Sequence, residues 1–240
     1  MTETTQRTAL VTGASRGLGL ALTSGLVAEG WRVIATARHG TELAQATAPL
    51  GNGVIPVSGD VADPQHQAEL ARAVADGLDL LVNNASSLGP SPLPALGGVD
   101  LDAVHRVYEV NVHAPLALIQ ATLPALRSAG GMIMNISSDA AIGAWEGWGV
   151  YGSSKAALDQ LTAVLAAENP DLAVYAVDPG DMRTQMHADA FPGEDISDRP
   201  LPDTVVPPLL ALISQRPASG RYRAQEFVGN RQTDQQVEVA

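Results

Sequence analysis

One lysine stands in a pattern that suits acid–base chemistry. Lys155 is the only lysine of the chain, whose other basic residues are all arginine, and it follows Tyr151 by four positions in the stretch GVYGSSKAAL. Residues four apart share one face of a helix, so the phenol and the ammonium would lie together. An ammonium beside a phenol favours the phenolate, and we expect Lys155 to lower the pKa of Tyr151 from about 10 toward working pH. A general acid–base group works best with such a matched pKa.

A Tyr-x-x-x-Lys pair can also be an ordinary surface pair of an amphipathic helix. Here the flanking residues are small and apolar, which favours a packed helix in which a buried cation needs a task or a partner. Lysine offers three rotatable donors that can hold two neighbouring hydroxyl groups, whereas the flat guanidinium of arginine prefers planar, bidentate partners. This difference explains why a chain rich in arginine would keep one lysine.

A second group of residues suits phosphate binding. The stretch TALVTGASRGLGLAL places Gly13, Gly17 and Gly19 between an apolar run and a helical pattern. Glycines allow a tight turn and close approach to a ligand, and the N-terminus of the following helix offers free N–H groups to a pyrophosphate. Glycines can also simply end strands and cap helices. The strand before and the helix after favour the nucleotide site.

The elements that must position these residues alternate along the chain. Short apolar runs predict buried strands at 8–12, 31–37, 53–57, 78–82, 131–136 and 172–177, with a last strand near 220–227. Helical patterns lie between them, at 17–29, 40–48, 64–75, 101–128, 152–168 and 203–214. This alternation predicts an α/β fold in a single domain over 1–240: a Rossmann-like, doubly wound parallel sheet of about seven strands with helices on both faces. A polar tail is expected at 229–240.

Composition narrows the classes of function and partner. The 240 residues, 45% hydrophobic and 17% charged, are typical of a folded globular domain. A net charge of −12 argues against nucleic acid and anionic membranes as partners. The chain has no cysteine, no signal-peptide pattern and no apolar run of the roughly 20 residues that cross a bilayer, so we expect a cytoplasmic protein. The five histidines show no ligand spacing, so we predict no metal site.

The combined motifs resemble the short-chain dehydrogenase/reductase family, in which the glycine spacing of TGASRGLG is typical. Further family motifs follow in order up to about residue 184: GDVAD, LLVNNAS, YEVNVHAPL, NISSDAA, the Tyr-x-x-x-Lys pair and DPGDMRT. The resemblance implies an NADP(H)-dependent oxidoreductase that reduces a ketone or aldehyde, or oxidises the corresponding secondary alcohol, with a tyrosine as proton donor.

Four catalytic residues are implied by this resemblance. Tyr151 would donate the proton, while Lys155 would adjust its pKa and contact the nicotinamide ribose. Ser138, thirteen residues before Tyr151, matches the serine whose hydroxyl donates to the same carbonyl oxygen. Asn111 matches the asparagine that holds a water in a proton relay behind the lysine. The neighbouring Ser137 is assigned a structural role.

The resemblance also implies the cofactor-binding residues. Together with Tyr151 and Lys155 they come from the glycine loop, the ends of several strands and the segment after the sixth strand: Gly13, Ser15, Arg16, Gly17, Leu18, Gly19, Arg38, Asp60, Val61, Asn84, Ala85, Pro179, Gly180, Met182 and Thr184.

The choice between NADP(H) and NAD(H) depends on the end of the second strand. Relatives that use NAD carry an acidic residue there, where this chain has Ala37 followed by Arg38. Arg38 and Arg16 could pair with a 2′-phosphate, so we predict a preference for NADP(H) over NAD(H). Each arginine could instead be an ordinary solvated side chain.

No motif identifies the substrate pocket, so its walls are predicted from the residue types of three segments. We expect the pocket walls at 87–94, 138–151 and 181–202, the last as a lid over the substrate. Large apolar side chains in these walls favour an apolar or aromatic carbonyl or alcohol substrate: Trp145, Trp148, Met182, Met186 and Phe191. The tryptophans could instead pack at a subunit interface. We expect His187 to be exposed.

Assembly, departures and alternatives complete the sequence-based predictions. Family members pair through helices corresponding to 101–128 and 152–168, so we expect a homodimer or a tetramer. The chain departs from the family pattern at Ser86, where relatives have glycine, and in SGRYRAQEFVGN, which lacks the usual V-D-G-G. A non-catalytic NADP(H)-sensing regulator remains an alternative. An epimerase or dehydratase is another, although those relatives need an added substrate domain.

Overall fold

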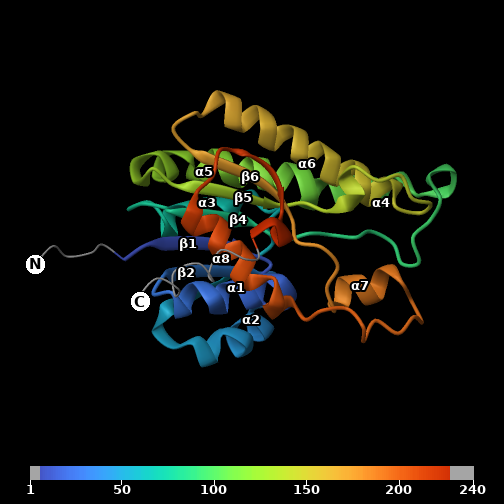
Figure 1. The fold of residues 1–240 in the computed structure, drawn as a ribbon, viewed down its shortest axis with the longest axis horizontal. Coiled ribbons are helices and arrows are strands. Elements are labelled where there is room, and N and C mark those ends of the chain that lie inside the picture. Colours follow the sequence, from blue (N-terminus) through green and yellow to red (C-terminus); the bar gives the residue numbers. More distant parts are fainter. Residues whose placement is uncertain (1–5, 228–240) are drawn as a thin grey trace, which may run out of the picture.

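The computed structural model describes residues 6–227 and contains one parallel sheet covered by helices on both faces (Figure 1). The strand order is β3-β2-β1-β4-β5-β6-β7. The strands are β1 (Thr8–Thr12), β2 (Arg32–Ala37), β3 (Val54–Ser58), β4 (Leu80–Asn83), β5 (Met132–Ile136), β6 (Ala173–Asp178) and β7 (Gly220–Arg223). The predicted seven-stranded Rossmann-like fold is confirmed.

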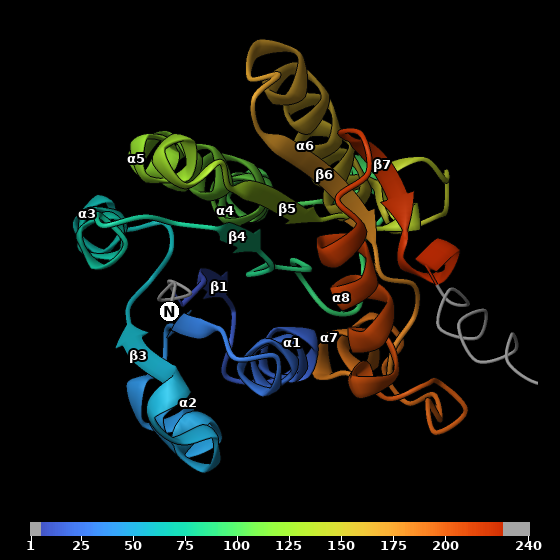
Figure 2. The same ribbon diagram turned by 60° about the vertical axis from the view of Figure 1, so that its left-hand side comes forward.

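Helices form a layer on each face of the sheet, as the end-on view in Figure 2 shows. One face is covered by α1 (Gly17–Ala28), α2 (Gly40–Thr47) and α8 (Val206–Gln215). The other is covered by α3 (Pro64–Ala73), α5 (Ala114–Ala129) and α6 (Gly149–Glu168). The remaining helices, α4 (Leu101–Tyr108) and α7 (Gln185–Ala190), lie beside the carboxyl ends of the strands.

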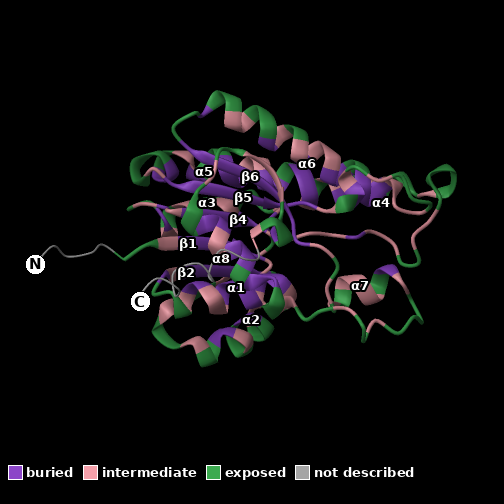
Figure 3. Ribbon diagram, viewed as in Figure 1, coloured by how far each residue is buried: buried purple, intermediate pink, exposed green. Residues whose placement is uncertain are grey.

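Side chains that alternate along each strand supply two separate cores. Leu10 of β1 is in register with Ile34 of β2 and Leu81 of β4, and all three pack with α3 and α5. Their neighbours Val11 and Val82 point to the opposite face, toward α1 and α8. Both faces of the central strands are therefore buried, which explains why β1, β2, β4, β5 and β6 are continuous apolar runs (Figure 3).

The structure corrects three details of the predicted elements. The expected helix at 101–128 is interrupted by a π-helical turn at Glu109–His113, between α4 and α5. The last strand ends at Arg223, and a 3₁₀ turn occupies Ala224–Phe227. The loose segment 181–202 contains α7. The predicted tail at 229–240 lies outside the described residues, and within 6–227 no helix is long and apolar enough to cross a membrane.

Candidate active site

A cleft of about 1570 Å³ lies at the carboxyl ends of the strands. Parallel strands end at one edge of the sheet, and the chain reverses direction across the sheet between β1 and β4. The loops that leave β1 and β4 therefore diverge to opposite faces and leave a crevice between them. The cleft is also walled by α6 and by the segment after β6.

The glycine loop between β1 and α1 forms one side of this cleft. Gly13 and Gly17 have φ values of +68° and +57°, in the left-handed region that favours glycine. Gly19 does not line the cleft, but a Cβ there would lie 2.2 Å from the carbonyl oxygen of Gly13. The absence of a side chain at Gly19 thus lets α1 begin directly against the end of β1.

The start of α1 fits a bound phosphate group. Arg16 occupies the N-cap position in an extended conformation, and its side chain makes no capping hydrogen bond. The first-turn N–H groups of α1 are therefore available at the cleft. Asn84 holds the end of β4 against the loop, because its Nδ2 donates to the carbonyl oxygen of Thr12 at 2.8 Å.

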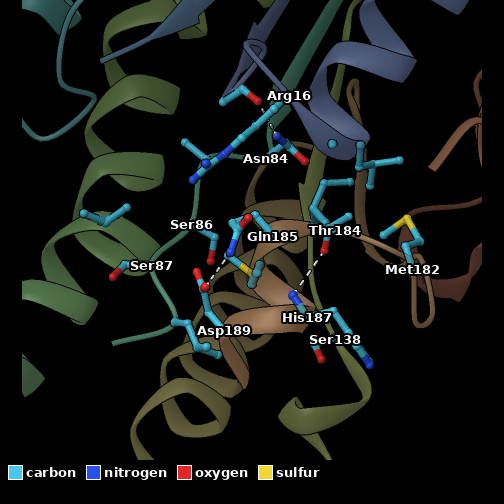
Figure 4. A pocket seen from close by; sticks show the side chains of 18 of the residues that line it. Arg16, Asn84, Ser86, Ser87, Ser138, Met182, Thr184, Gln185, His187 and Asp189 are labelled. Carbon is cyan, nitrogen blue, oxygen red and sulfur yellow. Dashed lines mark hydrogen bonds between the residues drawn. The ribbon is translucent and has the colours of Figure 1, made fainter. Parts of the chain in front are cut away.

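The residues predicted to bind cofactor converge on this cleft, with Gly19 behind its wall as the exception. Figure 4 shows the side chains of several of them at the pocket. Those that line it are Gly13, Ser15, Arg16, Gly17, Leu18, Arg38, Asp60, Val61, Asn84, Ala85, Tyr151, Lys155, Pro179, Gly180, Met182 and Thr184. Arg16 and Arg38 are both exposed on the side of the cleft near the ends of β1 and β2.

Tyr151 lies in the first turns of α6, with only 8% of its surface exposed. Burial raises its pKa to about 12. The hydroxyls of Ser138 and Ser86 act in the opposite direction, while the negative charges of Asp139 and Asp178 add to the rise in pKa. The phenol is therefore protonated throughout the neutral pH range.

Lys155 is 2% exposed and lies one turn further along α6. Its Nζ donates to the carbonyl oxygen of Ile136 at 2.8 Å and lies 5.6 Å from the centre of the Tyr151 ring. Burial lowers the pKa of Lys155 to about 8, opposed by the charge of Asp159. The predicted lowering of the Tyr151 pKa by Lys155 is wrong for this structure, because desolvation of the phenol dominates and the ammonium bonds a carbonyl group.

Asn111 lies in the π-helical turn and is 1% exposed. Its Oδ1 accepts from the backbone N–H of Ser87 at 2.7 Å and from the hydroxyl of Ser86 at 3.1 Å. Its Nδ2 donates to the carbonyl of Ser87 and to the hydroxyl of Ser154, both at 2.9 Å. Asn111 thus sits behind the cleft and joins the loop after β4 to α6, and the departure at Ser86 contributes one of these bonds.

An apolar cluster forms the end of the cleft beside Tyr151. The ring centre of Trp148 lies 5.8 Å from that of Tyr151 and 5.9 Å from that of Phe191. The cluster also contains Leu88, Leu93, Ala140, Met186 and Ala190. Trp145 is 49% exposed and does not line the cleft. All three predicted wall segments reach this cleft, and the Ser91 hydroxyl donates to the Asp189 carbonyl at 2.6 Å across it.

Other features of the site differ from the predictions made for them. The side chain of His187, expected to be exposed, is 11% exposed because it stacks on Phe191 at 4.9 Å. The sequence analysis did not identify Asp178, which lines the cleft and accepts from the Gly180 N–H at 3.0 Å. Its place directly before Pro-Gly at the end of a strand could have indicated it.

Within residues 6–227 no three histidine or acidic side chains are grouped as a metal site requires.

Comparisons with known proteins agree with this geometry. The family model for short-chain dehydrogenases matches residues 7–195. The short chain dehydrogenase asqE of Emericella nidulans is 39% identical over 68% of this chain and 65% of its own length. A Haemophilus influenzae protein named "Probable NADP-dependent dehydrogenase" is 34% identical over 72% of this chain and 70% of its own.

Solved structures of short-chain dehydrogenases have the same fold as this chain and about 30% sequence identity to it. A short-chain dehydrogenase from Escherichia coli CFT073, in complex with NADPH, superposes with a TM-score of 0.85 at 31% identity. The match covers 91% of this chain and 96% of that one. The family model spans well over half of the chain, and strands β1 to β6, the glycine loop and the Tyr-x-x-x-Lys pair all lie in the matched region. The chain is therefore an oxidoreductase of the short-chain dehydrogenase family.

Proposed function

We propose that the protein is an NADP(H)-dependent carbonyl reductase that reduces a ketone or aldehyde, and in reverse oxidises the secondary alcohol. One observation carries this proposal: Tyr151, Ser138 and Lys155 line the same cleft as the glycine loop and the free N-terminus of α1. A dinucleotide held by that loop would extend along the cleft toward the tyrosine. When bound, NADPH supplies the hydride.

Tyr151 donates the proton in this proposal. Its raised pKa keeps the phenol protonated at neutral pH, so the proton is present when the substrate oxygen becomes basic. The hydroxyl of Ser138 faces the same space and can donate to that oxygen, which holds the substrate carbonyl toward the phenol. In the oxidation direction the phenolate is required, so a raised pKa favours reduction at neutral pH.

Lys155 and Asn111 support the tyrosine from behind. Only one of the three N–H donors of the Lys155 ammonium is directed to Ile136, and the others can hold ribose hydroxyls. Asn111 fixes Ser86 and Ser87, and through Ser154 it is tied to the helix that carries Tyr151 and Lys155. In the proposed mechanism, Asn111 would also hold a water that relays a proton from behind Lys155.

The preference for NADP(H) is proposed from Arg16 and Arg38. Both are exposed guanidinium groups at the cleft, where a 2′-phosphate could accept two charge-assisted hydrogen bonds. The name of the Haemophilus protein and the NADPH in the Escherichia structure support this assignment. The aromatic cluster around Trp148 supports an apolar or aromatic substrate.

The test is an NADPH-oxidation screen over ketones, aldehydes and quinones. The unmodified protein should turn over at least one apolar or aromatic carbonyl compound. Tyr151→Phe should bind NADPH within about 2-fold of the unmodified protein and lose at least about 100-fold in kcat, because general acid catalysis contributes that much. Full activity in that variant would show that the proton donor is another group. NADPH binding without any turnover would favour the sensing alternative.

A further inference from the structure

Arg221 lies on β7, in the C-terminal stretch where the chain departs from its family pattern. Its Nε donates to Asp159 Oδ2 at 2.9 Å, and its Nη2 donates to the carbonyl oxygen of Ser138 at 2.9 Å. The same Nη2 lies 3.9 Å from Asp178 Oδ2. The Arg221 side chain is 27% exposed and that of Asp159 is 15% exposed, so this ion pair is partly shielded from solvent.

The three partners of Arg221 come from three different walls of the candidate active site. Asp159 is on α6, one helical turn after Lys155. Ser138 follows β5 and begins the wall beside Tyr151, and Asp178 ends β6 directly before Pro179. A single side chain from the edge strand therefore joins the segments that must stay in register around the substrate carbonyl.

We propose that Arg221 is a positioning residue, which acts on catalysis by holding the backbone of Ser138 at a fixed place relative to helix α6. This inference rests on the proposed function, in which the Ser138 hydroxyl donates to the substrate oxygen. Productive hydrogen-bond geometry tolerates errors of only about 0.5 Å, so an anchored backbone carbonyl at the catalytic serine matters directly.

The chemistry of the side chain fits this role. A guanidinium is a planar fork and can donate to a carboxylate and a carbonyl at once, whereas an ammonium is a point donor. The Ser138 hydroxyl accepts from the N–H of Ala140 and donates to Asp139, both at 3.1 Å, and neither bond fixes the Ser138 backbone carbonyl. The turn also packs on the start of α6, where Gly152 lies against the Ala140 carbonyl oxygen. Through Asp159, Arg221 adds a polar tie between the Ser138 backbone and the middle of α6.

A purely structural ion pair is the competing explanation. The second oxygen of Asp159, Oδ1, is buried and has no hydrogen-bond partner within residues 6–227. Removing Arg221 would leave this carboxylate without its counter-ion, so Arg221→Met should lower the melting temperature under either explanation. Loss of stability alone therefore does not distinguish the two, and the decisive measurements must concern Ser138.

The experiment is a double-mutant cycle between Arg221 and Ser138, measured with the carbonyl substrate found in the screen. Arg221→Met should lower kcat by about 10- to 100-fold, the effect expected when a reacting group is misplaced. NADPH affinity and KM should stay within about 2-fold, since the glycine loop is untouched and Asp178 keeps its bond from the Gly180 N–H without Arg221. Arg221→Lys should recover part of kcat. In a Ser138→Ala background, Arg221→Met should change the residual kcat by less than about 2-fold, because the group it positions is gone.

Arg223→Met is the matched control, on the same strand and the same side of it. Arg223 is exposed and, within the described part of the chain, takes part in no side-chain hydrogen bond or ion pair, yet it also lowers the pKa of Asp178. The Arg223→Met substitution therefore removes one positive charge near Asp178, as Arg221→Met does, but breaks no bond to Ser138. Its kcat should stay within about 2-fold of the unmodified protein, as for an ordinary surface substitution.

Hydrogen–deuterium exchange provides a readout that needs no substrate. Arg221→Met should speed amide exchange in residues 138–143, and Arg223→Met should not. Equal losses of kcat from Arg221→Met with and without Ser138 would overturn the inference, and so would unchanged exchange at 138–143. If the unmodified protein reduces no carbonyl compound, the proposed function fails, while the exchange experiment still decides whether Arg221 holds this segment.

Discussion

Burial, more than proximity, sets the acid–base properties of the two central residues. Tyr151 and Lys155 are both almost fully covered, and desolvation favours the uncharged form of each. The pKa of the phenol is consequently raised to about 12 and that of the ammonium lowered to about 8. The two groups therefore differ from the phenolate–ammonium pair that their spacing predicts.

This burial predicts that Lys155 costs the protein stability. Its folded-state pKa of about 8 lies below the ordinary value of 10.5, so the unfolded chain binds the proton more tightly. The penalty is fully present below about pH 8 and disappears as pH rises through 10.5, and at 1.36 kcal/mol per pKa unit it amounts to about 3 kcal/mol. Lys155→Met should raise the free energy of unfolding at pH 7 and much less at pH 10, while activity is lost. Urea denaturation at both pH values measures this, and a less stable variant at pH 7 would contradict it.

A substitution of the single residue Arg38 tests the proposed preference for NADP(H). Arg38→Asp removes a charge-assisted hydrogen bond to a 2′-phosphate and adds repulsion, so NADPH affinity should fall by about 10-fold or more. NADH affinity should change far less, because the aspartate can accept from the 2′-hydroxyl. Titration of both cofactors by fluorescence tests this. Equal affinities for NADPH and NADH in the unmodified protein would contradict the assignment.

At the scale of elements, the fold was predictable because both faces of the sheet are buried. Continuous apolar runs located β1 to β6, and strand–helix alternation indicated that they run parallel in one sheet. The π-helical turn at Glu109–His113 was not predictable, because its Asn111 bonds to Ser87 and Ser154, which are remote in sequence. Strand β7 is short and polar and lies at an edge of the sheet. No local sequence pattern therefore indicated that Arg221 contacts the site.

Because α1 lies close against the end of β1, adding one methyl group at Gly19 should affect both stability and cofactor binding. In Gly19→Ala the new Cβ would meet the Gly13 carbonyl oxygen at 2.2 Å and Asn84 Nδ2 at 2.5 Å. Because backbone must move, stability should fall by about 1–3 kcal/mol. NADPH affinity should fall with it, since the loop changes shape.

Gly97→Ala is the control for this change, because a Cβ at Gly97 would have no neighbour within 4 Å. It should alter stability by less than about 0.5 kcal/mol. Calorimetry and NADPH titration of both variants provide the comparison. Unchanged NADPH binding in Gly19→Ala would show that the glycine loop does not hold the cofactor.

At the scale of the whole molecule, we propose a homodimer formed through the outer faces of α5 and α6. Val164 of α6 is a large apolar side chain that is 42% exposed, and pairing through this helix would bury it. Val164→Asp should convert a dimer into a monomer in light scattering coupled to size exclusion, because a buried unpaired charge opposes association. Leu201→Asp, at a 50% exposed position away from α6, should leave the assembly unchanged. A monomeric unmodified protein at micromolar concentration would contradict the proposal.

The strand order also has a consequence for a chain that is still being synthesised. The first strand to emerge, β1, occupies the middle of the sheet, and β2 and β3 can dock beside it early. Its other edge stays open until β4 emerges, which exposes that edge to wrong partners in a crowded cell. The glycine loop and α1 thus emerge long before β7, so under the proposed function a nascent chain could hold nucleotide well before Arg221 can anchor the Ser138 backbone.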